Sequence, residues 1–402
     1  MSLKTQRSKH IDWEETRKRF LYREERINAL EDEALRLSRY NANVGDSEEL
    51  KYRARDHIHN TQINAVRNAN MWAKFGDTWR EHAVANRKFI RSSIDRPWPK
   101  KLVSPAHLII GAGPGLDKEI ENIRMIKREG LATIWCVDMA LHALRVQGIK
   151  PDVVVSCDFH TEHVPKMLLA YKSVTHPPCV FFPQSPPEAV RRYKGQRLFA
   201  VGVDMIGELG KLVPEVHALP PYPSHGTVSG MALMMARNIG GCVTKMVGIV
   251  GNDLSYPIEG ENVSQYCKHT IRANQPDGRS VHTKESIAIG DNGGEEVIIE
   301  MRNEEGEFVG EHRIFTTPLM TIYAESFRKV FEAEPQVAAQ QKRDPVIYVN
   351  TTRSVLDAYS ATNAKHGSLM ACKQFISLPM QNFIAGARKL KELRKRNLEG
   401  KL

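Results

Sequence analysis

Three apolar runs in the middle of the chain alternate with amphipathic stretches, and this alternation is the strongest constraint on the fold. The runs are His107–Ile110, Thr133–Val137 and Val153–Ser156. The first ends in a glycine turn, and the other two are followed by Asp138 and Asp158. Short apolar strands joined by helices form parallel sheets, whose working residues follow the carboxyl ends of the strands. We therefore predict an α/β fold, a Rossmann-like and mostly parallel sheet with helices on both faces.

The flanking segments have different patterns. Residues 1 to about 100 are highly charged, carry apolar residues at helical spacing and end at Asp95–Pro99, so we expect an all-helical N-terminal extension. Alternating residues at Glu296–Met301 and Phe308–Phe315 predict a small β-hairpin insertion. The predicted domains are the extension at 1–100, the α/β domain at 101–365, and a C-terminal helix with a basic tail at 366–402. Further predicted elements are the strands Val180–Phe182, Leu198–Val203, Lys245–Val250 and Val346–Val349 and the helices Trp13–Tyr40, Leu116–Glu129, Ala140–Gln147, Thr227–Asn238 and Thr321–Phe331.

Composition narrows the class of protein. No apolar run approaches the roughly 20 residues that span a bilayer, and the first ten residues have no apolar core of a signal peptide. The six cysteines are scattered, with no C-x-x-C pair, which favours free thiols in a reducing compartment and no metal site. We predict a cytoplasmic protein that does not insert into membranes.

The formal net charge of +10 favours an anionic ligand. No RNA- or DNA-binding signature accompanies this charge, so we predict no nucleic-acid partner. The helical N-terminal region carries an aromatic stripe that could pack on the α/β domain or form a homo-oligomer contact.

The glycine turn Gly111–Gly115 is the first candidate binding element. It follows a predicted strand and opens a predicted helix, where glycines allow close backbone approach and exposed N–H groups can hold a phosphate. Pro114 interrupts a dinucleotide fingerprint, and no G-K-[ST] follows as in a Walker loop. Asp138 and Asp158 could accept hydrogen bonds from a ribose or base, or hold Mg²⁺ beside a phosphate.

A second set of candidates follows later in the chain. The stretch Thr227–Gly230 opens another predicted helix and offers hydroxyl and N–H groups to an anion. Gly251–Tyr256 follows the next predicted strand. Tyrosines could donate hydrogen bonds to a leaving phosphate, and a histidine could act as general base for an acceptor hydroxyl. The candidates for these catalytic roles are Tyr256, Tyr266, His269 and His282.

Five motifs, in order, resemble a known family. They are G-A-G-P-G-L-D, I-W-C-V-D-M-A-L-H-A-L, G-I-K-P-D-V-V-V-S-C-D, G-T-V-S-G-M-A-L-M-M-A and G-N-D-L-S-Y-P. The set resembles the MptE-like domain shared by the motility-associated (Maf) flagellin glycosyltransferases and the archaeal 6-hydroxymethylpterin diphosphokinases. It is also similar to the CMP-dependent bacterial sialyltransferases, in which a G-N-G-P-S turn and an S-G helix start contact the nucleotide from two sides. The resemblance implies nucleotide contacts at Gly111, Gly113, Pro114, Ser229, Gly230, Gly251 and Asp253. Gly115 and Thr227 depart from the family pattern but belong to the same two loops, so we include them among the predicted nucleotide-binding residues.

Three functions remain open, and we favour the first. It is glycosyl transfer from a nucleotide sugar, implied to be a CMP-linked nonulosonic acid, to a hydroxyl of a protein, glycan or small molecule. The second is Mg²⁺-dependent pyrophosphoryl transfer from ATP to a pterin alcohol. The third is a nucleotide-binding scaffold without catalysis, which Gly115 favours because the sialyltransferase turn has a serine at this position.

Overall fold

The computed structural model describes residues 48–161, 164–169, 176–222, 226–240, 243–256, 262–263, 266–270, 282–283, 295–302, 308–316, 318–352, 354–359, 372 and 374–399. The chain divides into two compact units, Met1–Gly76 and Asp77–Leu402. Helix α2 (Glu48–Ile94) contains this division and ends just before Asp95–Pro99, as predicted. The division lies earlier than the boundary predicted near residue 100. The helix predicted at Trp13–Tyr40 lies outside the described residues.

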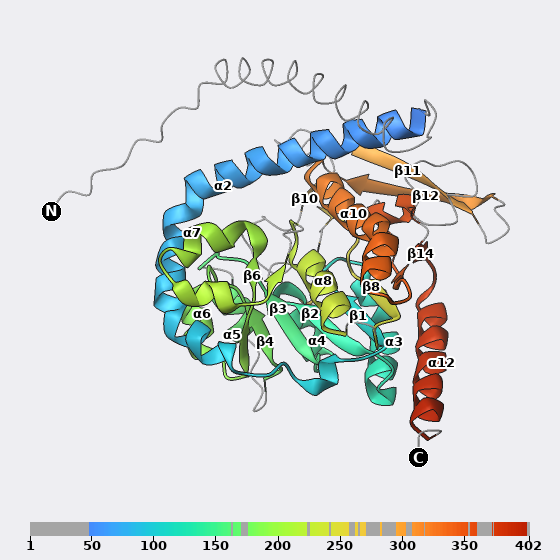
Figure 1. Ribbon diagram of the computed structural model, residues 1–402. Coiled ribbons are helices and arrows are strands. Elements are labelled where there is room, and N and C mark those ends of the chain that lie inside the picture. The colour runs from blue at the N-terminus through green and yellow to red at the C-terminus, as the bar shows by residue number, and fades with distance from the viewer. Residues whose placement is uncertain are drawn as a thin grey trace. The chain divides into compact units, whose positions relative to one another are not determined.

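The larger unit is built on a parallel sheet, which confirms the predicted α/β fold (Figure 1). Among the described residues this sheet has eight strands in the order β14-β13-β8-β1-β2-β3-β4-β5. Each neighbouring pair is parallel. Their bounds are β1 (Ala106–Ile110), β2 (Thr133–Val137), β3 (Val153–Ser156), β4 (Cys179–Phe181), β5 (Arg197–Phe199), β8 (Met246–Val250), β13 (Ile347–Asn350) and β14 (Phe375–Ser377).

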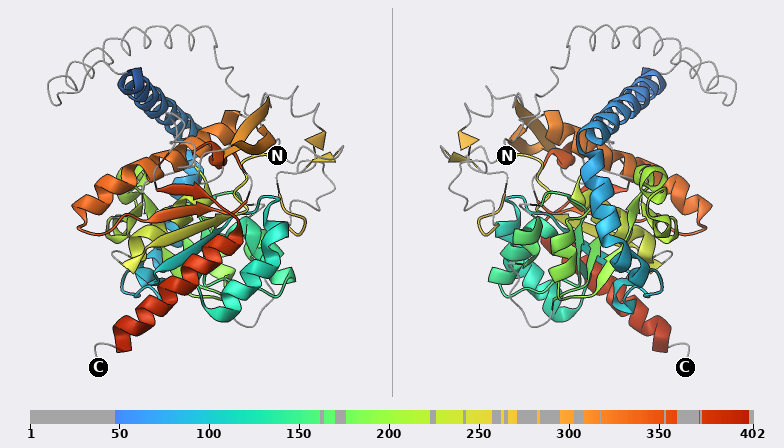
Figure 2. Two further views of the ribbon diagram at one scale, coloured as in Figure 1. Left: turned by 90° about the vertical axis from the view of Figure 1, so that its right-hand side faces the viewer. Right: turned by 90° about the vertical axis from the view of Figure 1, so that its left-hand side faces the viewer.

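Helices cover both faces of the sheet, as predicted. Their bounds are α3 (Leu116–Glu129), α4 (Asp138–Val146), α5 (Val164–Leu169), α6 (Pro187–Arg192), α7 (Ile206–Gly210), α8 (Val228–Gly240), α10 (Pro318–Gln340) and α12 (Met380–Glu399). Ile109 and Ile249 share one apolar core with α8 and α10. Their neighbour Gly248 faces the other side, against Phe383 of α12, as the two-residue period of a strand requires. On that side α12 packs beside α3, where Arg388 pairs with Glu129 (Figure 2).

A buried ionic cluster joins α8, α10 and β13. The carboxylate of Glu334 is completely buried and accepts a hydrogen bond from the Tyr348 hydroxyl at 3.0 Å. It also forms ion pairs with Arg237 at 2.9 Å and Arg343 at 2.6 Å. A buried carboxylate needs such partners because it has lost its hydration. The cluster therefore fixes the position of α10 against the sheet.

The smaller elements include the predicted hairpin, formed by β11 (Glu295–Arg302) and β12 (Phe308–Thr316), which are antiparallel. The remaining short strands are β6 (Val201–Gly202), β7 (Pro221–Tyr222), β9 (Asn262–Val263) and β10 (His282–Thr283). Short 3-10 helices are η1 (Lys100–Leu102), η2 (Val203–Met205), η3 (Pro214–Ala218) and η5 (Val355–Tyr359). No helix in the described ranges is both long and apolar enough to cross a membrane.

Three predictions of local structure were wrong. The single strand predicted at Leu198–Val203 is two short strands, β5 and β6, followed by a 3-10 turn. Helix α4 begins at Asp138 rather than Ala140, because the Asp138 carboxylate accepts a hydrogen bond from the Met139 N–H at 2.8 Å. The segment 366–402 is more than a helix and tail, since β14 extends the main sheet through its pairing with β13. A three-residue strand has too little periodicity to be recognised in sequence.

The order of the strands creates a topological switch point between β1 and β8. From β1 the chain moves through β2, β3, β4 and β5 on one side. It then returns to β8 on the other side of β1 and continues to β13 and β14. In open α/β sheets, ligands bind in the crevice outside the carboxyl ends of the strands at such a point. We therefore expect a ligand site at the loops that follow β1 and β8.

We predict that Gly111→Ala destabilises the fold. A methyl group at residue 111 would overlap the carbonyl oxygen of Gly251 and lie 2.9 Å from its carbonyl carbon. Because both are backbone atoms, the two loops would have to separate. We expect the free energy of unfolding in urea to fall by about 1–3 kcal/mol, as for overpacking in a core. Gly207→Ala is the matched control, since a methyl group there meets no atom within 4 Å. Equal stability of the two variants would contradict the close approach.

Candidate functional site

The glycine turn after β1 lies directly on the end of β8. The Gly111 N–H donates to the carbonyl of Val250 at 2.9 Å, and the Gly113 N–H donates to the carbonyl of Gly251 at 2.7 Å. Gly251 itself has a φ of 62°, a left-handed conformation that glycine adopts without strain. The structure thus brings together the two loops that the sequence motifs singled out.

The first turn of α3 is bonded within the protein. The Gly115 N–H donates to Asp253 Oδ2 at 2.8 Å, so this carboxylate from the β8 loop caps the helix. The N–H groups of Leu116, Asp117 and Lys118 donate to carbonyls of the turn itself, at 3.0, 3.2 and 3.3 Å. The predicted phosphate seat at this helix start is therefore occupied by a carboxylate of the same chain.

Asp253 connects three parts of the site. Its side chain is 4% exposed, and burial raises the pKa of this carboxyl to about 7. Hydrogen bonds from the Gly115 N–H and from the Thr352 side chain act in the opposite direction and lower the pKa. Thr352 Oγ1 also accepts a hydrogen bond from the Gly251 N–H at 3.3 Å. Asp253 thereby joins the start of α3 to the β8 loop and to the segment after β13.

The same carboxylate explains why residue 115 is glycine. A Cβ atom at this position would lie 2.5 Å from Asp253 Oδ1 and 2.8 Å from Thr352 Cβ. A serine would require Asp253 to move and would break the cap on α3. The absent serine hydroxyl is thus a consequence of packing at the switch point, and Gly115 gives no independent support for loss of activity.

The start of α8 is arranged differently. Thr227 caps this helix, since its Oγ1 accepts a hydrogen bond from the Gly230 N–H at 3.0 Å. The N–H groups of Val228 and Ser229 lie in the first turn, where a helix offers them no internal acceptor. Ser229 Oγ donates to Asn252 Oδ1 at 2.7 Å, which joins this turn to the β8 loop. The start of α8 is therefore joined to the β8 loop at the switch point.

Asn252 is a residue of the site that sequence reasoning missed. It lies between Gly251 and Asp253, both of which were predicted from the strand-end motif. Its side chain is 6% exposed. The signal was its position in the first residues after a buried strand, where side chains face the crevice.

Asp138 and Asp158 form hydrogen bonds with residues at the ends of β2 and β3. Asp138 is buried, and its Oδ2 accepts a hydrogen bond from Ser156 Oγ at 2.7 Å. Asp158 Oδ1 accepts from the N–H groups of Phe159 at 2.7 Å and His160 at 3.2 Å. These bonds give both aspartates a structural role at the carboxyl ends of β2 and β3. Their predicted contacts with a ribose, base or metal stay predictions.

The segment Tyr266–Thr270 lies against the glycine turn. The Cys267 N–H donates to the carbonyl of Ala112 at 2.8 Å. The Lys268 N–H donates to Asp117 Oδ2 at 3.0 Å, and His142 Nδ1 donates to the carbonyl of His269 at 2.9 Å. Tyr266 and His269 thus belong to a segment that is hydrogen-bonded to the glycine turn, α3 and α4.

Tyr256 lies at the end of the β8 loop and is 7% exposed. Its N–H donates to the carbonyl of Phe315 at 2.7 Å. Burial raises the pKa of Tyr256, and the nearby Tyr266 raises it further. The two predicted tyrosines therefore interact electrostatically. The structure describes only the backbone of His282, in β10, so its side chain lies outside the described residues.

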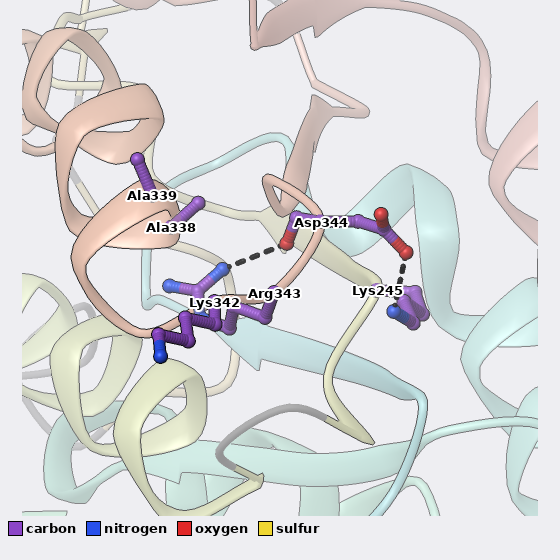
Figure 3. Close-up of a pocket in the computed structure, with 6 residues that line it drawn as sticks. All are labelled: Lys245, Ala338, Ala339, Lys342, Arg343 and Asp344. Carbon is purple, nitrogen blue, oxygen red and sulfur yellow. Dashed lines mark hydrogen bonds and ion pairs between the residues drawn. The ribbon is translucent and has the colours of Figure 1, made fainter.

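A pocket at the amino ends of β8 and β13 does not coincide with this site (Figure 3). Its cavity volume is about 430 Å³, and it is lined by Lys245, Ala338, Ala339, Lys342, Arg343 and Asp344. Lys245 and Asp344 precede β8 and β13 and form an ion pair at 2.8 Å. Ala338 and Ala339 lie in the last turn of α10, and Lys342 and Arg343 follow the end of this helix. We therefore read this pocket as structural.

We predict that Asp253 gives the protein a distinct pH dependence. Its pKa in the folded protein, about 7, lies above the value of 3.8 for a free aspartate. Between these values the folded state keeps a proton that the unfolded state has lost, so stability falls as pH rises from about 4 to about 7. Asp253→Asn cannot titrate and lacks this contribution.

The measurement is the melting temperature of wild type and Asp253→Asn at steps from pH 4 to pH 8. We expect the wild type to lose stability relative to the variant as pH rises to about 7, and the difference to level off above that. A difference that grows in favour of the wild type would show that the α3 cap keeps Asp253 ionised.

Comparison with known proteins agrees with the motifs. Residues 82–259 match the family described as 6-hydroxymethylpterin diphosphokinase MptE-like. The solved structure of MAf glycosyltransferase from Magnetospirillum magneticum AMB-1 is similar at 12% identity and a TM-score of 0.44, covering 75% of this chain. The chain covers 38% of the length of that protein. No curated protein matches the chain. The matched segment 82–259 contains the β1 and β8 loops and the start of α8.

Proposed function

We propose that this protein is a nucleotide-dependent transferase that holds the donor phosphate at the first turn of α8. The contrast between the two helix starts carries this proposal. At α3 the amides are capped by Asp253 and by the glycine turn. At α8 the N–H groups of Val228 and Ser229 lie in the first turn without an intrahelical acceptor. Open amides at a helix start, beside the switch point, favour an anionic group such as phosphate.

The reaction we infer is glycosyl transfer. The bond between the anomeric carbon and the donor phosphate oxygen breaks, and the acceptor hydroxyl oxygen bonds to that carbon. The acceptor proton passes to a base, and His269, in the segment that is hydrogen-bonded to the glycine turn, is our candidate. Such a reaction needs stabilisation of the departing phosphate more than covalent catalysis.

Tyr256 and Tyr266 are the candidates for hydrogen bonds to the departing phosphate. Burial raises the pKa of Tyr256, which keeps its hydroxyl protonated and able to donate. Motif resemblance to the Maf proteins and sialyltransferases supports a CMP-linked sugar as donor, and a protein or glycan hydroxyl as acceptor. Self-association through the helical N-terminal region is part of the same proposal.

Pyrophosphoryl transfer is the second candidate, because the matched family is described as diphosphokinase-like. That reaction would use Mg²⁺ bridging the phosphates. The described carboxylates fit this role poorly. Asp253 caps α3 and Asp138 holds Ser156. Within the described ranges, no three His, Cys, Asp or Glu side chains are grouped as metal ligands. We therefore place sugar transfer first.

A ligand panel separates the candidates. We expect CMP and CDP to raise the melting temperature without added metal. A ligand at 100 times its dissociation constant stabilises the folded state by about 2.7 kcal/mol. Stabilisation by ATP only in the presence of Mg²⁺ would support the diphosphokinase instead. If no nucleotide changes the melting temperature, both enzymatic candidates fail, and the nucleotide-binding scaffold fails with them.

A second test concerns the general base. If CMP-sugar transfer is detected, we expect His269→Ala to lower kcat far more than His282→Ala, by roughly 10²–10⁴-fold, the usual contribution of a positioned base. His282→Ala is the matched control from the same region of the chain. Small and equal effects of the two substitutions would remove His269 from the mechanism.

A further inference from the structure

Asn252 has a buried donor that the protein does not use. Its Oδ1 accepts the Ser229 hydroxyl at 2.7 Å, but its Nδ2 is buried and has no hydrogen-bond acceptor among the described residues. A buried donor without a partner has lost its hydration with nothing in return, so buried polar groups are nearly always hydrogen-bonded. An unpaired amide next to a helix start therefore indicates a ligand atom that accepts hydrogen bonds.

A chain of hydroxyl groups leads to this amide and ends on its oxygen. The Gly230 N–H donates to Thr227 Oγ1, which lies 3.2 Å from Ser229 Oγ. Since the Ser229 proton points to Asn252, the Thr227 proton is the one shared with Ser229. Every hydroxyl thus donates in the same direction, and the chain ends on an acceptor. The end of the Asn252 amide that remains is the NH₂ group.

The position of this NH₂ group selects the chemistry of its partner. It lies beside Ser229, in the first turn of α8, where the open N–H groups favour negative charge. Asp253, the next residue along the chain, is directed to the start of α3. A donor in this setting suits an anionic oxygen better than a sugar hydroxyl, which would need an acceptor as well.

We propose that Asn252 is a positioning residue for the donor phosphate, with Nδ2 donating to a phosphate oxygen at the first turn of α8. This inference rests on the proposed function, because it takes α8 as the phosphate seat. Asn252 would fix the phosphate relative to the β8 loop, and Ser229 would fix Asn252. The ligand class is a phosphate monoester or diphosphate, recognised through its charge and oxygens rather than through its base.

The test uses two substitutions that separate the donor from the acceptor role. Asn252→Asp keeps an oxygen for the Ser229 hydroxyl but has no N–H to donate, whereas Asn252→Ala removes both. Asn122→Asp is the matched control, since it adds the same charge in α3 at a residue whose amide donates to Glu119. Calorimetry on the full chain measures binding of inorganic pyrophosphate, CMP and cytidine.

We expect the wild type and Asn122→Asp to bind pyrophosphate and CMP equally well. Asn252→Ala should bind both at least tenfold more weakly, and Asn252→Asp more weakly still, with cytidine affinity changed by less than twofold. A variant that merely misfolds would lose cytidine binding too, and the melting temperature reports this directly.

Other outcomes are equally clear. If both Asn252 variants bind CMP and pyrophosphate like the wild type, the inference is wrong while the proposed function stands. If cytidine and CMP affinities fall by the same factor, Asn252 acts on the base or on the fold, and the inference is again wrong. If the wild type binds neither pyrophosphate nor any of the nucleotides, the phosphate seat at α8 fails, and the proposed function fails with it.

Discussion

The contact between the β1 and β8 loops is the constraint on which the rest of the site depends. Gly111 and Gly113 lie so close to Gly251 and Asp253 that no side chain fits between the two loops. Backbone hydrogen bonds and the Asp253 cap on α3 close this contact. Because β1 and β8 flank the switch point, the geometry of the whole crevice follows from it.

Because of this contact, the starts of α3 and α8 differ in how their N–H groups are bonded. A cap from Asp253 makes α3 a structural element, anchored to the sheet through a buried carboxylate. At the start of α8 the first-turn amides have no intrahelical acceptor, and the Ser229–Asn252 hydrogen bond links this turn to the β8 loop. A glycine-rich turn before a helix is usually read as the anion site. Here the tertiary contact caps that turn from within the protein, and we propose the second helix for the anion.

Much of the fold could be predicted because local periodicity survives in the structure. The runs at Thr133–Val137 and Val153–Ser156, and the helix Leu116–Glu129, have their predicted bounds. The two strands are buried on both faces, so they read as continuous apolar runs, and the helix shows its own period because one of its faces is buried. The short strand β14 and the split at β5 and β6 were missed, since elements of two or three residues are stabilised by neighbours rather than by their own pattern.

The sequence by itself determined the α/β class, the order of the motifs and the two loops that meet at the crevice. These features depend on residue types and spacing along the chain. Only the tertiary structure decided what the individual groups do. It directed Asp253 to the Gly115 N–H, made Gly115 a packing requirement and left the Asn252 amide with an unused donor. The reason is that hydrogen-bond partners such as Gly115 and Asp253 lie 138 residues apart in the chain, so no local pattern could assign them.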